Sequence, residues 1–151
     1  MQRIQPPISY NFSVSFANAN GKTSTDTYFS EVSGIGAEIT YEEVREGGQH
    51  DTIYYLPGNI VYSNLVFKRG LAPFGSEILQ WCFDTLSTKN NIVEPKNIVV
   101  SLLDADQKSY MTWSFFEAYP VKWQVGDFNA QVSGIAIEII EIRFNKMTYN
   151  K

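Results

Sequence analysis

The chain has 151 residues, of which 44% are hydrophobic, 15% aromatic and 19% charged, and its formal net charge is −4. This length predicts a single domain, residues 1–151, that buries a core without disulfides or metal ions. The acidic balance argues against the basic surface that sequence-independent nucleic-acid binding requires. The charged fraction is below the ~25% of a typical domain, which fits a surface partly covered by copies of the same chain.

Alternating apolar and polar residues predict strands along most of the chain, and Gly, Pro and Asn clusters separate them. The expected strands are residues 8–16, 25–32, 37–45, 60–68, 98–103, 110–117, 121–125 and 135–144. In the last of these the apolar residues change face between Ile139 and Ile140. That change predicts a bulge or, as we prefer, a strand that passes from one packing partner to another.

One helix is predicted between Pro73 and Ser87, because its apolar residues form a single stripe. The stripe consists of Ile78, Leu79, Cys82, Phe83 and Leu86. Many strands, one helix and no βαβ rhythm predict a mainly β fold, a two-sheet antiparallel β-barrel or sandwich with one α-helix.

The stretch from residue 46 to residue 70 predicts an extended arm. Gly47 and Gly48 give it flexibility, Pro57 and Gly58 form a turn signal, and a strand follows from residue 60. The arm, at about residues 46–59, is expected to leave the body, turn and return. Such an arm serves to contact a neighbouring chain.

Candidate catalytic and metal-binding residues are few. His50 and Cys82 are the single histidine and the single cysteine, so neither a closed zinc site nor a cysteine–histidine pair is supported. The Asp104-x-Asp106 pattern fails as a calcium loop, because Ser109 and Phe115 replace its glycine and glutamate. We expect no cofactor and no metal ion.

Acidic residues gather around the strand at 37–45, and three tryptophans lie in predicted elements. Glu38, Glu42, Glu43 and Glu46 favour a solvated face, or one half of an intersubunit salt bridge with Lys68 or Arg69. A hydrolase using Glu42 or Glu46 is the least favoured alternative. Trp81, Trp113 and Trp123 favour core packing over a sugar-binding platform. A β-sandwich module that binds carbohydrate stays open as an alternative.

An ordered set of short motifs spans nearly the whole chain. They are FSEVSGI (29–35), EGG (46–48), LPG (56–58), YSNL (62–65), KRG (68–70), MTWSF (111–115), AYP (118–120) and IAIE (135–138), with Trp81 in the helix. In this order and spacing the chain resembles the tail-tube proteins of contractile phage tails and of related contractile injection systems. The ring protein of type VI secretion systems has a similar fold, and a relative of that protein is a second alternative.

The resemblance implies a structural protein and not an enzyme. Hexameric rings would stack into a rigid hollow tube, which sheath contraction drives through a target envelope. The implied partners are further copies of the chain, a sheath protein, baseplate or spike proteins and a tube-terminating cap, with cargo or DNA in the lumen and no stable membrane association. Assembly would occur in the cytoplasm, and the product would be part of a phage tail or of an injection particle that is released or anchored.

The expected contacts between subunits and rings lie in and beside the arm. They are Glu46, Gly47, Gly48, Tyr55, Leu56, Pro57, Gly58, Asn59, Tyr62, Lys68 and Arg69. Deleting residues 47–59 is expected to leave the domain folded but unable to stack. Either Lys122 and Gln124 or Ser13 and Ser15 are candidates for lining the channel.

Overall fold

The computed structural model describes residues 11–17, 23–48, 52–70, 76–87, 93–126 and 136–150, which form ten strands and one helix. The strands are β1 (Asn11–Ala17), β2 (Thr23–Phe29), β3 (Glu31–Ser33), β4 (Glu38–Arg45), β5 (Ile53–Val61), β6 (Leu65–Gly70), β7 (Lys96–Leu103), β8 (Ser109–Val125), β9 (Ile137–Arg143) and β10 (Lys146–Asn150), and the helix is α1 (Glu77–Leu86). The predicted mainly β class with antiparallel sheets and one helix is confirmed.

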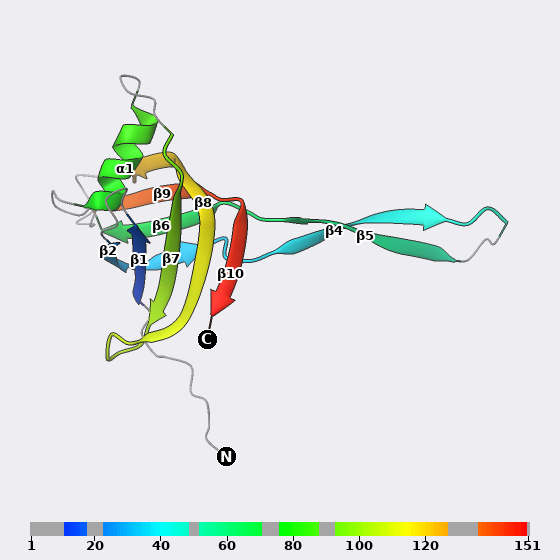
Figure 1. Cartoon of the computed structure of the whole chain (residues 1–151), viewed down its shortest axis with the longest axis horizontal. Coiled ribbons are helices and arrows are strands. Elements are labelled where there is room, and N and C mark those ends of the chain that lie inside the picture. The colour runs from blue at the N-terminus through cyan, green and yellow to red at the C-terminus, as the bar shows by residue number, and fades with distance from the viewer. Residues whose placement is uncertain are drawn as a thin grey trace, which may run out of the picture.

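Eight strands form one sheet in the order β2-β1-β7-β8-β9-β6-β3, and β10 also pairs with β8. Strand β8 is 17 residues long, and its first part pairs with β7 and β10 while its last part pairs with β9. Because β8 belongs to both parts, the sheet folds over into two layers. One layer contains β1, β2, β7 and β10, and the other contains β3, β6 and β9 (Figure 1).

The two strands predicted at residues 110–117 and 121–125 are one strand, β8. It changes partners between Ala118 and Tyr119. Just before that point Glu117 has a φ of 53°, and just after it the β8–β9 register shifts between Pro120 and Lys122. A left-handed residue and a bulge change the direction of a strand without ending it, so the break in pattern marks a corner.

The core fills the space between the two layers and beneath α1. Phe29 contacts Phe67 across the layers, with ring centroids 5.4 Å apart, and Phe115 contacts Phe144 at 4.8 Å. The buried apolar cluster is Val14, Phe16, Phe29, Leu65, Phe67, Ile78, Trp81, Cys82, Ile98, Val100, Phe115, Ala118, Ile140, Ile142 and Phe144. Each large apolar side chain buried in this way contributes about 1.5–3 kcal/mol, so the body has a core of its own.

Helix α1 packs on this core with a different face from the predicted one. Its buried residues, Ile78, Trp81, Cys82 and Thr85, follow the i, i+3, i+4, i+7 spacing of one helix face. Phe83 and Leu86 of the predicted stripe are exposed instead. The predicted stripe is therefore wrong in part. It was chosen from apolar residues alone, so it left out the buried Thr85 and included the exposed Phe83.

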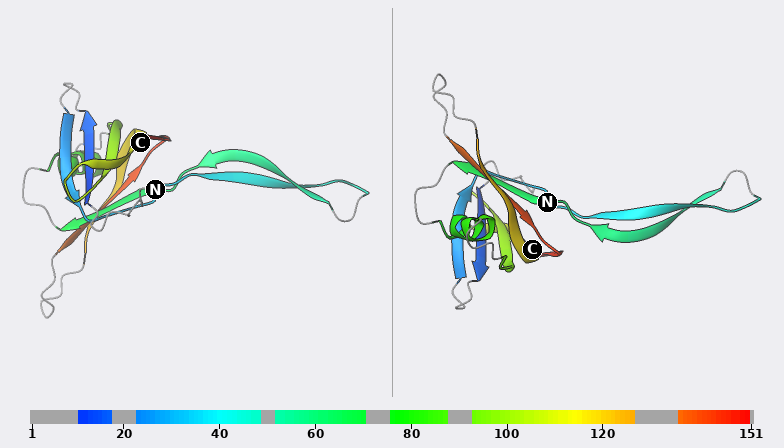
Figure 2. Two further views of the ribbon diagram at one scale, coloured as in Figure 1. Left: turned by 90° about the horizontal axis from the view of Figure 1, so that it is seen from below. Right: turned by 90° about the horizontal axis from the view of Figure 1, so that it is seen from above.

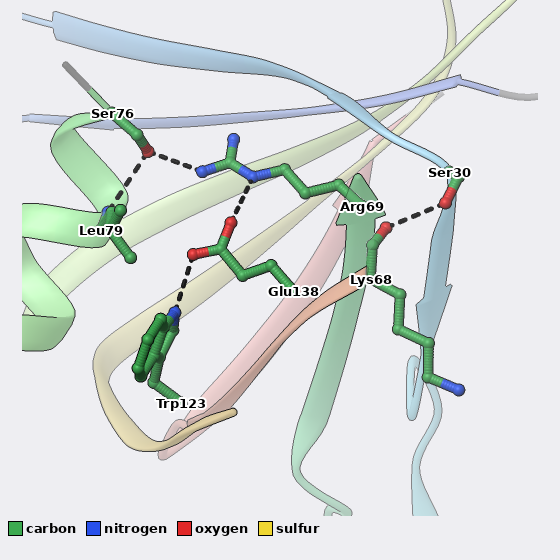
Figure 3. A network of polar contacts seen from close by, with 7 residues as sticks. All are labelled: Ser30, Lys68, Arg69, Ser76, Leu79, Trp123 and Glu138. Carbon is green, nitrogen blue, oxygen red and sulfur yellow. Dashed lines mark hydrogen bonds and ion pairs between the residues drawn. The ribbon is translucent and has the colours of Figure 1, made fainter. Parts of the chain in front are cut away.

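A buried ion pair between β6 and β9 joins this layer to the start of the helix (Figure 3). Arg69 of β6 donates from Nε to Glu138 Oε2 of β9 at 3.0 Å, and both side chains are at most 4% exposed. The second carboxylate oxygen of Glu138 accepts a hydrogen bond from Trp123 Nε1 at 2.7 Å. Arg69 Nη2 donates to the helix-capping Ser76 Oγ, also at 2.7 Å. The pair is thus fully partnered, as a buried charge requires.

Strand β9 corrects the expected change of face at Ile139 and Ile140. Glu138, Ile140 and Ile142 alternate regularly on the buried face, and pairing with β6 runs without a shift. Neither a bulge in β9 nor a change of packing partner is needed. The pattern looked broken because a glutamate occupies an inward position, where Arg69 neutralises it.

Two further boundaries differ from the expected ones. Ser30 separates β2 from β3, and both its backbone N–H and its hydroxyl donate to Lys68 O. Residues 62–64 separate β5 from β6, so the strand predicted at 60–68 is wrong. Among the described residues, no helix is long and apolar enough to cross a membrane.

Candidate functional site

Strands β4 and β5 form a two-stranded antiparallel sheet that pairs with none of the other described strands. Figures 1 and 2 show this ribbon projecting from the body in all three views. We call residues 38–61 the arm. The described residues of the predicted arm, at about residues 46–59, lie in this ribbon, and all of β4 belongs to the ribbon as well.

Every residue of β4 and β5 is exposed, although many are apolar. The large apolar residues of the arm are Ile39, Tyr41, Val44, Ile53, Tyr54, Tyr55, Leu56, Ile60 and Val61. Tyr41 is 68% exposed and Ile60 is 60% exposed. An isolated two-stranded ribbon is marginally stable in water, and a large exposed apolar surface marks an interaction site.

The two faces of the arm both carry apolar groups. Tyr41 and Tyr55 contact edge to face, with ring centroids 5.4 Å apart, and Ile39 is paired with Ile60. Glu42 is paired with Leu56, and Val44 with Tyr54, so these four side chains alternate with the first set along the ribbon. A surface of this kind suits an element that is covered on both sides by other protein.

Pro57 and Gly58 do not form the predicted turn, since both lie within β5. Near them Ile39 is paired with Ile60 but Tyr41 with Pro57, so β5 has one residue more than β4 in this interval. The Thr40 hydroxyl accepts from Asn59 N at 3.0 Å and donates to Asn59 O at 3.2 Å. A Cβ on Gly58 would lie 2.4 Å from the Thr40 hydroxyl oxygen. The Pro-Gly pair therefore forms a bulge, in which a strand tolerates both residues.

The structure brings most of the predicted contact residues together. Glu46, Gly47 and Gly48 follow β4, where Gly48 has a φ of 109°, and residues 55–59 lie in β5. Tyr62 lies at the base of the arm and Lys68 lies in β6 of the body, where it forms an exposed ion pair with Glu31 at 3.7 Å. Arg69 is 3% exposed and is paired with Glu138, so it is not available to a neighbouring subunit.

Sequence reasoning left the β4 half and the last two residues of β5 outside the arm, and it predicted no strand at residues 53–59. Ile39 and Tyr41 belong to the strand predicted at residues 37–45, and both are exposed. The uninterrupted run Ile53, Tyr54, Tyr55 and Leu56 is a signal that could have identified a ribbon covered on both faces.

The described residues give no support to the alternative functions, a metal site, a hydrolase or a sugar-binding platform. Within the described part of the chain, no three His, Cys, Asp or Glu side chains are placed to hold a metal ion. Glu42 is an exposed arm residue, and His50 lies outside the described residues. Trp81 is buried, with Nε1 donating to Glu94 O at 2.9 Å, and Trp113 and Trp123 are packed against the core.

The two candidate channel linings lie in different layers. Ser15 lies on the face of β1 opposite Val14, and its hydroxyl is 3.1 Å from that of Thr25 on β2. Lys122 and Gln124 lie in the part of β8 that pairs with β9. Both sets stay predictions.

The T4-like virus tail tube protein gp19 family matches residues 8–148. The chain belongs to this family. It is a tail tube protein, a structural component of a phage tail or contractile injection particle and not an enzyme. No curated protein sequence matches the chain.

Solved structures agree with this assignment. A chain of the anti-feeding prophage baseplate, described as six-fold symmetrised, is 27% identical with a TM-score of 0.83, covering 98% of this chain and 97% of that one. A chain of the sheath–tube complex of an extracellular contractile injection system, PVC, in the extended state is 25% identical with a TM-score of 0.75, covering 97% and 93%. An Hcp protein, at 13% identity and a TM-score of 0.58 with coverage of 92% and 91%, shares the fold.

Proposed function

We propose that six copies of this chain form a ring, that rings stack into the rigid inner tube of a contractile particle, and that the arm carries the contact between copies. The observation that supports this most is the arm itself, a ribbon exposed on both faces and unpaired with the described strands of the body. The fold of a single copy leaves the apolar arm uncovered. Contact with a second copy would bury it.

The contact we propose is between unlike surfaces, the arm of one copy and the body of another. A head-to-tail contact of this kind repeats without limit unless a rotation closes it. In one direction the six-fold rotation closes the ring, which is supported by the six-fold symmetrised assembly that contains the baseplate relative. Along the axis nothing closes the series, so the rings stack. Many repeated contacts of modest size then add up to a stiff tube.

The proposed contact residues are those of the arm and its surroundings. They are Glu46, Gly47, Gly48, Tyr55, Leu56, Pro57, Gly58, Asn59, Tyr62 and Lys68, together with Ile39, Tyr41, Val44, Ile53, Tyr54 and Ile60. The acidic residues of β4 stay candidates for intersubunit ion pairs. Arg69 leaves the predicted set because Glu138 already neutralises it.

The further partners of the tube are proposed from the relatives. Similar chains occur in a sheath–tube complex, in a baseplate and in a tube-terminating cap. A sheath protein, baseplate or spike proteins and a cap protein are therefore the partners that we propose for this chain, with cargo or DNA in the lumen. We propose that assembly takes place in the cytoplasm, before the particle is released or anchored.

Replacing residues 39–60 by Asn-Gly tests the role of the arm. Glu38 and Val61 are paired, so a two-residue hairpin turn can join them without moving the body. We expect the variant to keep its circular dichroism spectrum and cooperative unfolding, and to form no tubes in electron micrographs. The unmodified chain at the same concentration is the control. If that control stays monomeric at high concentration the proposed function is wrong, and if the variant forms normal tubes the role of the arm is wrong.

A further inference from the structure

The arm is a continuation of the ribbon formed by β3 and β6. Ser33 is paired with Val66 in the body, and Glu38 is paired with Val61 in the arm, five residues farther along each strand. The two connecting segments, which we call the legs of the arm, have the same number of residues between these pairs, so the register is kept across the interruption. We call this interruption, residues 34–37 and 62–64, the arm root. Both connections between the body and the arm pass through it.

The first feature of the arm root is the close approach of its two legs. Gly34 has a φ of +87°, and a Cβ on it would lie 2.0 Å from Asn64 O and 3.1 Å from Asn64 C. No other residue fits, because a side chain would collide with backbone that cannot rotate away. The two legs are therefore in backbone contact at Gly34 and Asn64.

The second feature is a set of hydrogen bonds from β9, the strand beside β6. Arg143 Nη1 donates to Tyr62 O at 2.6 Å and to Asn64 Oδ1 at 3.3 Å. Asn64 Nδ2 donates to Glu141 Oε1 at 2.8 Å. These side chains bind residues 62–64 where this segment leaves the sheet. The backbone pairing of β6 with β9 ends at Leu65, and beyond that point the charged Arg143 side chain supplies hydrogen bonds instead.

The third feature anchors the same leg in the core. The ring of Tyr62 packs on Phe144, with centroids 5.1 Å apart, and Phe144 is fully buried against Phe115. Tyr62 is thus held through its ring from the core side and through its carbonyl by Arg143. Two unlike attachments at one residue restrict rotation more than either alone.

We propose that Arg143, Asn64 and Gly34 are positioning residues, which fix the direction of the arm in the free chain before it meets a neighbour. This inference rests on the proposed role of the arm in assembly. A ribbon held in its binding direction loses less conformational entropy on association than one that swings freely. The arm root therefore acts on assembly without touching the partner.

Distances between spin labels on the free chain test the proposal. One label is placed at the arm tip by Glu46→Cys and the other on the body by Asp106→Cys, both exposed positions. Cys82 stays in place, because burial raises the pKa of its thiol to about 12 and so keeps it unreactive. The distance distribution is compared for the unmodified root, Arg143→Gln and Asn64→Ala. Lys108→Gln, which removes a positive charge in the β7–β8 turn, is the control.

We expect a narrow distribution for the unmodified root and for Lys108→Gln, and a broad one for Arg143→Gln and Asn64→Ala. The critical concentration for tube assembly should rise about tenfold in both root variants, as expected for one lost charge-assisted hydrogen bond. Gly34→Ala, which displaces the Asn64 backbone, should change the mean distance. Unfolding midpoints show whether each variant is folded.

Three results would overturn the inference. A narrow, unshifted distribution in all three root variants would show that the arm direction is set elsewhere. A broad distribution with unchanged tube assembly would show that the arm direction does not matter for assembly. Loss of folding in Arg143→Gln together with a normal distribution in Asn64→Ala would reduce Arg143 to a purely structural role. Failure of the unmodified chain to form tubes would instead contradict the proposed function, because the distances are measured without assembly.

Discussion

The body and the arm consist of the same kind of strand, yet they use their apolar side chains in opposite ways. In β9, Ile140 and Ile142 are fully buried between two layers. In β4 and β5 the corresponding residues, such as Tyr41 and Ile60, are exposed to solvent. In both regions successive side chains point to alternate faces of the strand. The difference lies in what covers these apolar side chains. In the body the other layer covers them, whereas in the arm no other described part of the chain does.

This comparison shows that a folded domain and an unfinished interface can have the same local pattern. The body also buries a charge pair, Arg69 with Glu138, whereas the arm leaves Glu42 and Glu43 in solvent. Burial of that pair is tolerable only because its groups are hydrogen-bonded on several sides. The body is thus complete in itself, and the arm is the part that requires a partner.

The largest expected effect is on the body. Glu138→Ala leaves the Arg69 guanidinium buried without a counter-ion, so we expect the free energy of unfolding to fall by about 3–5 kcal/mol in urea titrations. Glu31→Ala is the matched control, because it breaks the ion pair of the adjacent Lys68, which is exposed, and should cost at most about 1 kcal/mol. Equal losses in the two variants would contradict the distinction between the buried and the exposed pair.

A smaller effect is expected from Cys82 at alkaline pH. The pKa of this thiol is raised from 9.0 to about 12, chiefly by burial and also by the charge of Glu138, while Arg69 acts in the opposite direction. The unfolded chain releases the proton first, so this stabilisation is complete below pH 9 and is lost between pH 9 and about 12. By pH 10 the loss should be on the order of 1 kcal/mol. The difference in unfolding free energy between pH 8 and pH 10 should therefore be smaller in Cys82→Ala, and identical differences would refute the prediction.

The smallest effect on the free chain is expected in the arm. Tyr41→Ser should change the free energy of unfolding by no more than about 0.5 kcal/mol, because the side chain is already exposed. Tube assembly should nevertheless weaken, since a tyrosine covered at an interface contributes more than 1 kcal/mol in many cases. Tyr149→Ser is the matched control, because Tyr149 and Tyr41 are both 68% exposed. Equal effects of the two variants on assembly would contradict the proposal that the arm carries the contact between copies.

Sequence reasoning reached the class of the fold and the existence of an arm, but not the extent of that arm. Gly47 and Gly48 are local signals, and they follow β4 within the projecting ribbon. Ile39 and Tyr41 were assigned to a strand outside the arm, since alternation does not say what lies opposite each face. Pro57 and Gly58 were assigned to a turn because their place in a bulge depends on Thr40, which is distant in sequence.

The buried ion pair shows the same limit in the body. Glu138 disturbed the apolar pattern of β9, and only its contact with Arg69, on a strand far away in the chain, explains why a carboxylate lies inside. Arg69 in turn was expected at a subunit contact, as a partner for the acidic residues around the strand at 37–45. Neighbouring residues of a strand point to opposite faces, and the strand order determines which face is the core.

The amino-acid sequence by itself determined most of the strands, the helix, the fold class and the resemblance to the tail-tube family, because these depend on periodicity and on ordered local motifs. The tertiary structure alone decided where the arm begins, that Arg143 and Asn64 hold its root, and that Arg69 and Glu138 meet inside the body. These features join residues more than 60 positions apart, as for Arg69 and Glu138. Local patterns carry no information about such pairs, since chain topology brings them together.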